Sequence, residues 1–367
     1  MRVLLCGGGT AGHVMPAIAM AEIIKKSFPG SVIAFAGRRD GNENLSYEKS
    51  GHTLYTVDIV GLRRSLSINN IKAVFKAIKS SRDARAIITE FNPDLIIGTG
   101  GYVCYPFIRQ GQRLGIKTMM HESNVAPGLV TRLLGRKCEK VMLNLEGTRK
   151  SLKYAENTVV VGNPTRSDFG TMSKMAARRR LGVRDDETLI VSFGGSLGAG
   201  VLNRAVGELI GQYTLGSEKI RHIHATGKGN FEEMKNQFPS LFLDDNKVKI
   251  VPYIDDMPTH LIAADLAITR SGAITVSELC RSGTPSILIP SPNVTANHQY
   301  ANADYMRSLG ASRLIEENEL SAKRLYDEVN AILKSDEEMK KMARRAKGAY
   351  TRDTEKAIGN LIAKAVK

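Results

Sequence analysis

The chain of 367 residues carries 52 Lys and Arg against 37 Asp and Glu, a formal net charge of +15, with 42% hydrophobic residues. This length suits two domains, and the ordinary composition excludes a collagen-like, disordered or low-complexity chain. The four cysteines form no C-x-x-C pair, which argues against a zinc site or a disulfide framework and favours a reducing compartment. No apolar run reaches the roughly 18 residues of a membrane span, so any membrane contact should be peripheral. The basic excess predicts nucleic acid, an anionic membrane surface or a phosphorylated substrate as partner.

Short β-branched runs alternate with helix-like stretches along the chain. Continuous apolar strands separated by about 10–20 residues of amphipathic helix are typical of parallel strands covered on both faces. The expected fold class is therefore α/β with doubly wound parallel sheets. The predicted strands are residues 3–6, 32–36, 95–97, 117–121, 159–161, 189–193, 221–225, 248–251, 266–268 and 286–289.

The pattern of strand, glycine turn and helix starts twice, at residues 3–13 and at residues 190–199. It predicts two Rossmann-like domains, 1–162 and 163–348, joined near Pro164, which biases its neighbour away from helix. The last segment, about 349–367, is predicted to be a helix that packs back on the first domain. Because ligands bind beyond the carboxyl ends of parallel strands, two facing domains predict an active site in a deep cleft between them.

The first glycine turn, Gly7-Gly-Gly-Thr-Ala-Gly12, matches the G-x-G-x-x-G fingerprint, which lets backbone N–H groups approach a pyrophosphate. An NADP oxidoreductase is a competing interpretation, since Arg38 and Arg39 after the second strand would suit a 2′-phosphate. His13 follows in the first turn of a helix. The charge of a helix N-terminus disfavours the protonated imidazole, so His13 should be neutral and able to accept a proton. The alternative is a histidine that only caps the helix.

Two more loops follow predicted strands in the first half of the chain. Gly98-Thr-Gly-Gly-Tyr102 is a second glycine turn, and His121-Glu-Ser-Asn124 brings an imidazole, a carboxylate and an amide to the same edge of the sheet. Such polar groups suit sugar hydroxyls, and an ordinary polar loop is the alternative.

The second half repeats the phosphate-binding pattern in Gly194-Gly-Ser-Leu-Gly198, where Ser196 can donate a hydroxyl. Glu278 lies on a helix that starts at Gly272 or Ala273, where a carboxylate could bind both hydroxyls of a ribose. The chain has no D-x-D sequence, so no carboxylate-held metal is expected at a diphosphate. Helix ends, backbone N–H groups, Arg166 or Arg270 would meet its charge instead.

Residues 62–85 carry seven basic residues and one acidic residue, with an apolar stripe at helical spacing. Such a helix can lie on anionic lipid, and the alternative is a helix whose stripe packs on the sheet. Nucleic acid is not expected, because the chain has no Trp and no recognisable binding module. The predicted membrane contacts are Ile71, Val74, Phe75 and Ile78, with Lys72, Lys76 and Lys79 beside them.

Six motifs together resemble the MurG family of bacterial glycosyltransferases. They are the glycine turns at residues 7–13, 98–102 and 194–199, the segments 121–124 and 270–278, and Gly162-Asn-Pro-Thr-Arg166. The match runs in order from the first strand to beyond Gln299. The resemblance implies a GT-B fold and a peripheral enzyme at the cytoplasmic face of the bacterial cell membrane. That enzyme would move GlcNAc from UDP-GlcNAc to the 4-hydroxyl of MurNAc in lipid I (undecaprenyl-pyrophosphoryl-MurNAc-pentapeptide), which forms lipid II for peptidoglycan synthesis.

The resemblance further implies an inverting, metal-independent hexosyltransferase that needs no cofactor. Its partners would be UDP-GlcNAc, lipid I, anionic inner-leaflet phospholipid, and other proteins of cell-wall synthesis or division. Another GT-B nucleotide-sugar transferase with a lipid or small-molecule acceptor is the alternative. An NADP oxidoreductase would leave the glycine turn at 194–198 without a task, and a non-catalytic scaffold would leave His13 and Glu122 without one.

By resemblance, His13 is the catalytic base and Glu122 the second candidate. Ile254 would lie at the uracil and Glu278 at the ribose, and Gly9, Gly100, Gly101 and Tyr102 would form the acceptor loops. Ala11 stands where the family usually has Gly, and Ser123 where Gln is common. The residues implied for UDP-GlcNAc, of which 10–12 would also face the acceptor, are Thr10, Ala11, Gly12, Asn124, Arg166, Ser196, Ile254, Ala273, Ile274, Thr275, Val276, Ser277, Glu278 and Gln299, with Asn302 as a weaker candidate.

Overall fold

In the computed structural model the chain divides into two compact units. Unit 1 comprises Met1–Thr165 and Thr351–Lys367, and unit 2 comprises Arg166–Tyr350. The structure describes residues 1–41, 44–60, 68–164, 169, 172–195, 197–243, 246–351 and 353–366, and of these it describes residues 11, 68–75 and 77 by their backbone alone. Within the described residues no helix is long and apolar enough to cross a membrane.

Unit 1 contains a seven-stranded sheet in the order β3-β2-β1-β4-β5-β6-β7, with every neighbouring pair parallel. The chain proceeds outward from β1 to one edge and then returns to place β4 on the other side of β1. The strands are β1 (Arg2–Gly7), β2 (Val32–Arg38), β3 (Thr53–Val57), β4 (Leu95–Gly100), β5 (Lys117–Glu122), β6 (Lys140–Leu143) and β7 (Thr158–Val160).

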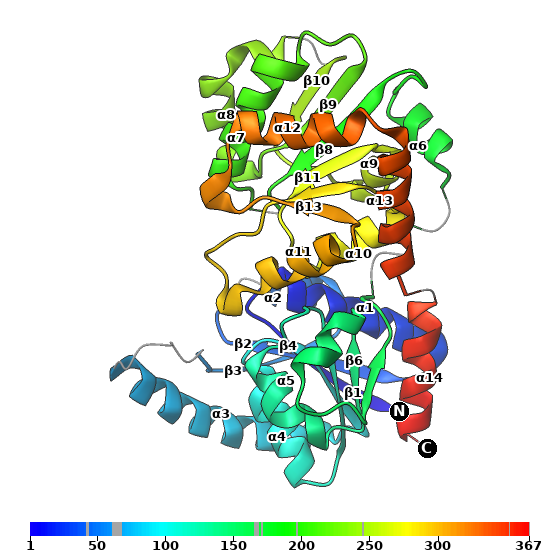
Figure 1. Ribbon diagram of the computed structural model, residues 1–367. Coiled ribbons are helices and arrows are strands. Elements are labelled where there is room, and N and C mark those ends of the chain that lie inside the picture. Colours follow the sequence, from blue (N-terminus) through cyan, green and yellow to red (C-terminus); the bar gives the residue numbers. More distant parts are fainter. Residues whose placement is uncertain are drawn as a thin grey trace. The chain divides into compact units, whose positions relative to one another are not determined.

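Helices cover both faces of this sheet (Figure 1). On one face lie α3 (Ile68–Phe91), α4 (Cys104–Arg113) and α5 (Leu129–Leu134), of which α3 packs against α4 and α4 against α5. On the other face α1 (Ala11–Ser27) packs against the C-terminal helix α14 (Thr354–Val366), and α2 (Asn44–Lys49) contributes the buried Tyr47.

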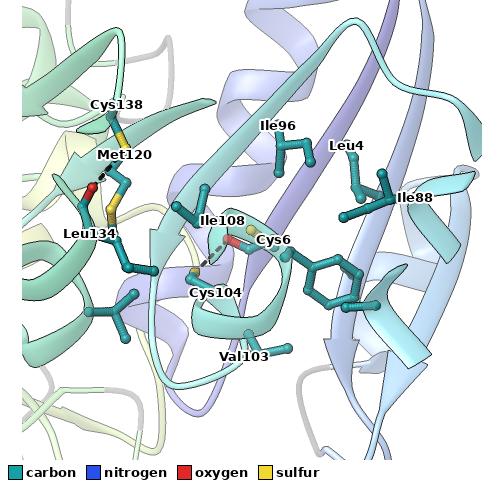
Figure 2. Packing of buried hydrophobic residues seen from close by; sticks show 14 of the residues in the cluster. Leu4, Cys6, Ile88, Ile96, Val103, Cys104, Ile108, Met120, Leu134 and Cys138 are labelled. Carbon is teal, nitrogen blue, oxygen red and sulfur yellow. Dashed lines mark hydrogen bonds between the residues drawn. The ribbon is translucent and has the colours of Figure 1, made fainter. Parts of the chain in front are cut away.

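The central strands are apolar throughout because both their faces are buried. In β1, Leu4 and Cys6 face the α3–α5 layer, whereas Val3 and Leu5 face α1 and α14. Figure 2 shows the first of these cores, where the thiol of Cys104 lies beside Cys6 and donates to its carbonyl at 3.0 Å. The core therefore reaches up to the residue that precedes the first glycine turn.

Unit 2 contains a six-stranded sheet in the order β10-β9-β8-β11-β12-β13, again parallel throughout. Its strands are β8 (Thr188–Phe193), β9 (Ile220–Ala225), β10 (Val248–Val251), β11 (Leu266–Thr269), β12 (Ser286–Leu288) and β13 (Ser312–Leu314). Its helices are α6 (Lys174–Arg180), α7 (Gly200–Leu209), α8 (Phe231–Gln237), α9 (Met257–Ala263), α10 (Ala273–Ser282), α11 (His298–Ser308), α12 (Ala322–Leu333) and α13 (Asp336–Ala349).

The structure confirms two doubly wound parallel sheets, and each of the ten predicted strands overlaps an observed one. Three observed strands were not predicted: β3, β6 and β13. The cleft between the two domains stays a prediction.

Candidate functional site

The order of strands in unit 1 reverses between β1 and β4, and this is where the two glycine turns meet. Cys6 pairs with Gly98, the register shifts, and Gly7 then pairs with Gly100. In doubly wound sheets the crevice beyond such a reversal point is where ligands bind, because the loops on either side diverge there. The topology thus brings both predicted acceptor turns to one place.

The two glycine turns are locked together through their backbones. The N–H of Gly8 donates to the carbonyl of Gly100 at 3.3 Å, and the buried Tyr47 hydroxyl donates to the carbonyl of Gly7 at 3.0 Å. Gly101 has φ +84°, and a Cβ there would lie 2.2 Å from the carbonyl oxygen of Gly8. Only glycine allows this approach.

His13 is half-buried in the first turn of α1, with its ring against the second glycine turn. A Cβ on Gly100 would lie 2.3 Å from His13 Cδ2. His13 Nδ1 lies 3.0 Å from the carbonyl oxygen of Gly8 and 3.2 Å from Thr10 Oγ1. Since a carbonyl can only accept, Nδ1 carries the proton, and in the neutral ring Nε2 then carries the lone pair.

Thr99 ties this histidine to the end of β4. Its buried hydroxyl donates to the backbone carbonyl of His13 at 2.7 Å and lies 3.3 Å from the carbonyl of Cys6. A Cβ on Gly7 would lie 2.2 Å from Thr99 Oγ1, so the glycine makes room for the hydroxyl. Thr99 was not among the predicted site residues. Its position inside the second glycine turn was the sequence signal that could have identified it.

Glu122, the second predicted base, holds the loop that follows β5. It is 6% exposed, and its carboxylate accepts hydrogen bonds from the N–H of Asn124 at 3.1 Å, the N–H of Gly128 at 2.8 Å and the hydroxyl of Thr131 at 2.8 Å. The hydroxyl of Thr148 in turn donates to the carbonyl of Asn124 at 3.0 Å. Asn124 is therefore placed at the carboxyl edge of the sheet by a buried carboxylate.

His121 is fully buried beneath this loop. Its Nε2 lies 3.0 Å from the carbonyl oxygen of Gly162, to which it donates, and Ser123 Oγ lies 3.4 Å from its Nδ1. Burial disfavours the charged imidazolium and lowers the pKa of His121 to about 4. His121 is thus neutral at physiological pH and serves to connect β5 with Gly162.

Unit 2 has its own reversal point between β8 and β11. After β8, the N–H of Gly198 donates to the carbonyl of Gly195 at 3.0 Å, and Asn230 donates to the carbonyl of Leu197 at 3.1 Å. After β11, Arg270 forms an ion pair with Glu317 and donates to the carbonyl of Ile289 at 3.2 Å. Arg270 is therefore engaged within unit 2.

A polar network joins the loop after β11 to the start of α11. Ser271 donates to the carbonyl of Gln299 at 2.8 Å, and Asn302 donates to the carbonyl of Ser271 at 3.1 Å. The side-chain oxygen of Gln299 accepts from the N–H of Ser291 at 2.9 Å. Of the two predicted amides, Asn302 is fully buried and Gln299 is half-buried.

Helix α10 begins at Ala273 directly beyond the reversal point, with Gly272 as its N-cap. Ile274, Thr275 and Glu278 are half-buried, whereas Val276 and Ser277 are buried and the hydroxyl of Ser277 donates to the carbonyl of Ala273 at 2.8 Å. Ile254, predicted at the uracil, is buried in the segment between β10 and α9. The N–H groups of a first helical turn have no acceptor within the helix and attract anions.

Some predicted site residues lie outside the described part of the chain, namely Arg166, Ser196 and the side chains of Ala11, Ile71, Lys72, Val74 and Phe75. Of the other predicted membrane contacts, Ile78 is 51% exposed, Lys79 is exposed, and Lys76 forms an ion pair with Asp58 at 2.9 Å. Tyr102 is 38% exposed. No group of His, Cys, Asp and Glu among the described residues is arranged to hold a metal ion.

Comparisons with known proteins match both units. The model of the glycosyltransferase family 28 N-terminal domain matches residues 3–143, and that of the C-terminal domain matches residues 189–358. A protein of Acetivibrio thermocellus is 39% identical over 95% of this chain and 93% of its own length, and one of Alkaliphilus oremlandii is 40% identical over 93% of each. Both are named UDP-N-acetylglucosamine--N-acetylmuramyl-(pentapeptide) pyrophosphoryl-undecaprenol N-acetylglucosamine transferase.

Among solved structures, MurG of Acinetobacter baumannii superposes with a TM-score of 0.80 at 25% identity over 99% of both chains. The similarity therefore extends over both sheets and is not confined to one nucleotide-binding motif. The chain belongs to glycosyltransferase family 28 and, within it, to the MurG family.

Proposed function

We propose that this chain transfers N-acetylglucosamine from UDP-GlcNAc to the 4-hydroxyl of MurNAc in lipid I, with inversion at the anomeric carbon, and so forms lipid II. The observation that carries the proposal is the end-to-end match to relatives whose names state this transfer. The alternative, a family member with another lipid or small-molecule acceptor, would use the same donor site and differ at the glycine turns of unit 1.

His13 is the base in this proposal. Its Nδ1 is held by the carbonyl of Gly8, so Nε2 would take the proton of the acceptor hydroxyl as that oxygen attacks the anomeric carbon. Glu122 is assigned a supporting role, because its carboxylate already accepts three hydrogen bonds from the loop that carries Asn124. Gly9, Gly100, Gly101 and Tyr102 would border the acceptor.

Unit 2 would bind the donor. Ile254 would contact the uracil and Glu278 the ribose hydroxyls, while Asn124 of unit 1 and Gln299 would hold the sugar. The start of α10, residues 273–277, and Ser196 would receive the diphosphate, with Arg166 as a further contact. A helix N-terminus and backbone N–H groups stabilise the charge that develops on leaving UDP without reorganisation, so we expect transfer without a metal ion.

The enzyme would act as a peripheral protein at the cytoplasmic face of the cell membrane, where the acceptor's lipid chain is anchored. The exposed Ile78 and Lys79 of α3 support this, because an apolar side chain flanked by basic ones suits an anionic lipid surface. Other proteins of cell-wall synthesis or division are candidate partners.

The test is release of UDP from UDP-GlcNAc by the full chain, with and without a short-chain lipid I analogue, in the presence of EDTA. Release that depends on the analogue and survives chelation is the expected result. Release without an acceptor would indicate hydrolysis. Tight UDP binding without any release would favour a different acceptor and overturn the proposed substrate.

A further inference from the structure

Arg270 occupies the first position after β11, in the short segment that leads to α10. Its side chain is 11% exposed, and its guanidinium contacts residues beyond the ends of the next two strands of the sheet. One nitrogen donates to the carbonyl of Ile289 at 3.2 Å, directly after β12, and the other pairs with Glu317, which lies three residues beyond β13. Arg270 thus connects the carboxyl end of β11 to those of β12 and β13.

Stability alone does not account for this ion pair. Both members are largely buried, since the side chain of Glu317 is 17% exposed. Burial removes most of the hydration of the two charges, and replacing such a pair by apolar side chains of similar volume is often neutral for stability. A guanidinium with two fixed partners does, however, set the position of the backbone that carries it. The pair therefore suits a role in the geometry of the segment before α10.

The next residue of the segment is fixed as well. Ser271 is fully buried, its hydroxyl donates to the carbonyl of Gln299 at 2.8 Å, and its carbonyl accepts from Asn302 Nδ2 at 3.1 Å. Both of these partners belong to α11. Two consecutive residues are thereby held by the ends of β12 and β13 and by α11. Only the N-cap Gly272 separates them from Ala273, the first residue of α10.

We propose that Glu317 is a positioning residue for the donor, which holds Arg270 and through it orients the first turn of α10 toward the diphosphate. This inference rests on the proposed function, in which the start of α10, residues 273–277, receives that diphosphate. Arg270 itself then makes no contact with the donor, in contrast to the role that the sequence suggested for it. Glu317 lies far from α10 in the sequence, so no local pattern could assign it this role.

The experiment measures the affinities of the full chain for UDP and for uridine by titration, because only UDP carries the diphosphate. Glu317→Ala removes the carboxylate that holds Arg270. The affinity for UDP should fall about tenfold, which is roughly the effect of one misaligned hydrogen bond to an anion, while the affinity for uridine changes little. Glu317→Gln keeps an oxygen that can accept from Arg270, and it should retain most of the UDP affinity.

A double variant separates positioning from stability. Loss of one charge leaves the other buried without its partner, which lowers the thermal midpoint. Arg270→Met with Glu317→Ala removes both charges and should recover much of that midpoint, while the UDP affinity stays low because the segment is no longer held. The matched control is the ion pair at the opposite end of β11, where Arg178 meets Asp265 at 2.9 Å with side chains 8% and 21% exposed. Asp265→Ala should lower the midpoint and leave the ratio of UDP affinity to uridine affinity unchanged.

UDP affinity that stays unchanged or rises in Glu317→Ala would overturn the proposal and indicate that the released Arg270 binds the diphosphate itself. Recovery of UDP affinity together with the midpoint in the double variant would overturn it too, because the pair would then act on stability alone. Equal losses of UDP and uridine affinity, shared by Asp265→Ala, would have the same meaning. The titrations need no acceptor, so a wild type that binds UDP without transferring a sugar fails the proposed function, while its variants still decide the role of Glu317.

Discussion

At the scale of single residues, the geometry around His13 selects one of its two ring nitrogens for proton transfer. The carbonyl of Gly8 can accept only from Nδ1–H, and this leaves the lone pair on Nε2. The hydroxyl of Thr99 donates a hydrogen bond to the backbone carbonyl of the same histidine. Orientation of the ring thus depends on groups that need not touch a substrate.

Thr99→Val removes the hydroxyl that binds the carbonyl of His13 while keeping the side chain's volume. We expect kcat to fall about tenfold, since small displacements of a catalytic group cost up to roughly a hundredfold. KM for UDP-GlcNAc should stay unchanged, because the contacts proposed for the uracil, the ribose and the start of α10 at the diphosphate lie in unit 2, whereas Thr99 belongs to unit 1. Thr99→Ser retains the hydroxyl and should restore the rate.

Steady-state kinetics with UDP-GlcNAc and the acceptor varied in turn separates these effects. Equal kcat in the Val and Ser variants would deny Thr99 a positioning role. A parallel rise of KM for UDP-GlcNAc in both variants would indicate a general loss of structure.

At the scale of elements, the predicted strands carry short runs rich in β-branched and other apolar residues. In β8 the run is buried from Leu189 to Phe193, whereas the predicted edge strands β7 and β10 are only partly buried. In the edge strand β3 two threonines interrupt the apolar residues, and the edge strand β13 has the sequence Ser-Arg-Leu, so neither carries a continuous apolar run. β6 is a four-residue strand with Met and Leu, which occur as readily in helices.

The candidate site likewise contains some features that local sequence patterns predict and others that only the tertiary structure brings together. Glycine turns after strands are local signals, and both turns of unit 1 were predicted from them. The contact between Thr99 and the carbonyl of His13 joins residues 86 positions apart, which no local pattern contains. The ion pair of Arg270 with Glu317 and the three bonds to Glu122 likewise depend on the tertiary structure.

At the scale of the whole molecule, buried histidines make stability depend on pH. Burial lowers the pKa of His121 and His224 to about 4 and that of His222 to about 3, from an ordinary value of 6.5. The unfolded chain therefore binds more protons than the folded one below pH 6.5. Their stabilising contribution is full above pH 6.5 and is lost as the pH falls toward 4.

His121→Gln removes one of these titrations and keeps an N–H that can donate to the carbonyl of Gly162. Between pH 7.5 and pH 4.5 the wild type should lose about 2–3 kcal/mol more unfolding free energy than the variant, at about 1.4 kcal/mol per pKa unit. Urea unfolding of both proteins at the two pH values measures the difference. His222 and His224 titrate alike in the two proteins, so their contributions cancel. Identical losses would show that His121 is not buried as a neutral group.

In the proposed mechanism, the reversal point of the parallel sheet in unit 1 presents His13 as the base for acceptor-dependent transfer. His13→Asn tests it most directly, because the Asn amide can still donate to the carbonyl of Gly8 while Nε2 is lost. We predict that acceptor-dependent UDP release falls by about 10²–10⁴-fold, that the acid limb of the kcat/KM profile disappears, and that UDP binding is unchanged. Near-normal turnover with the acid limb intact would contradict the account and move the base to another residue.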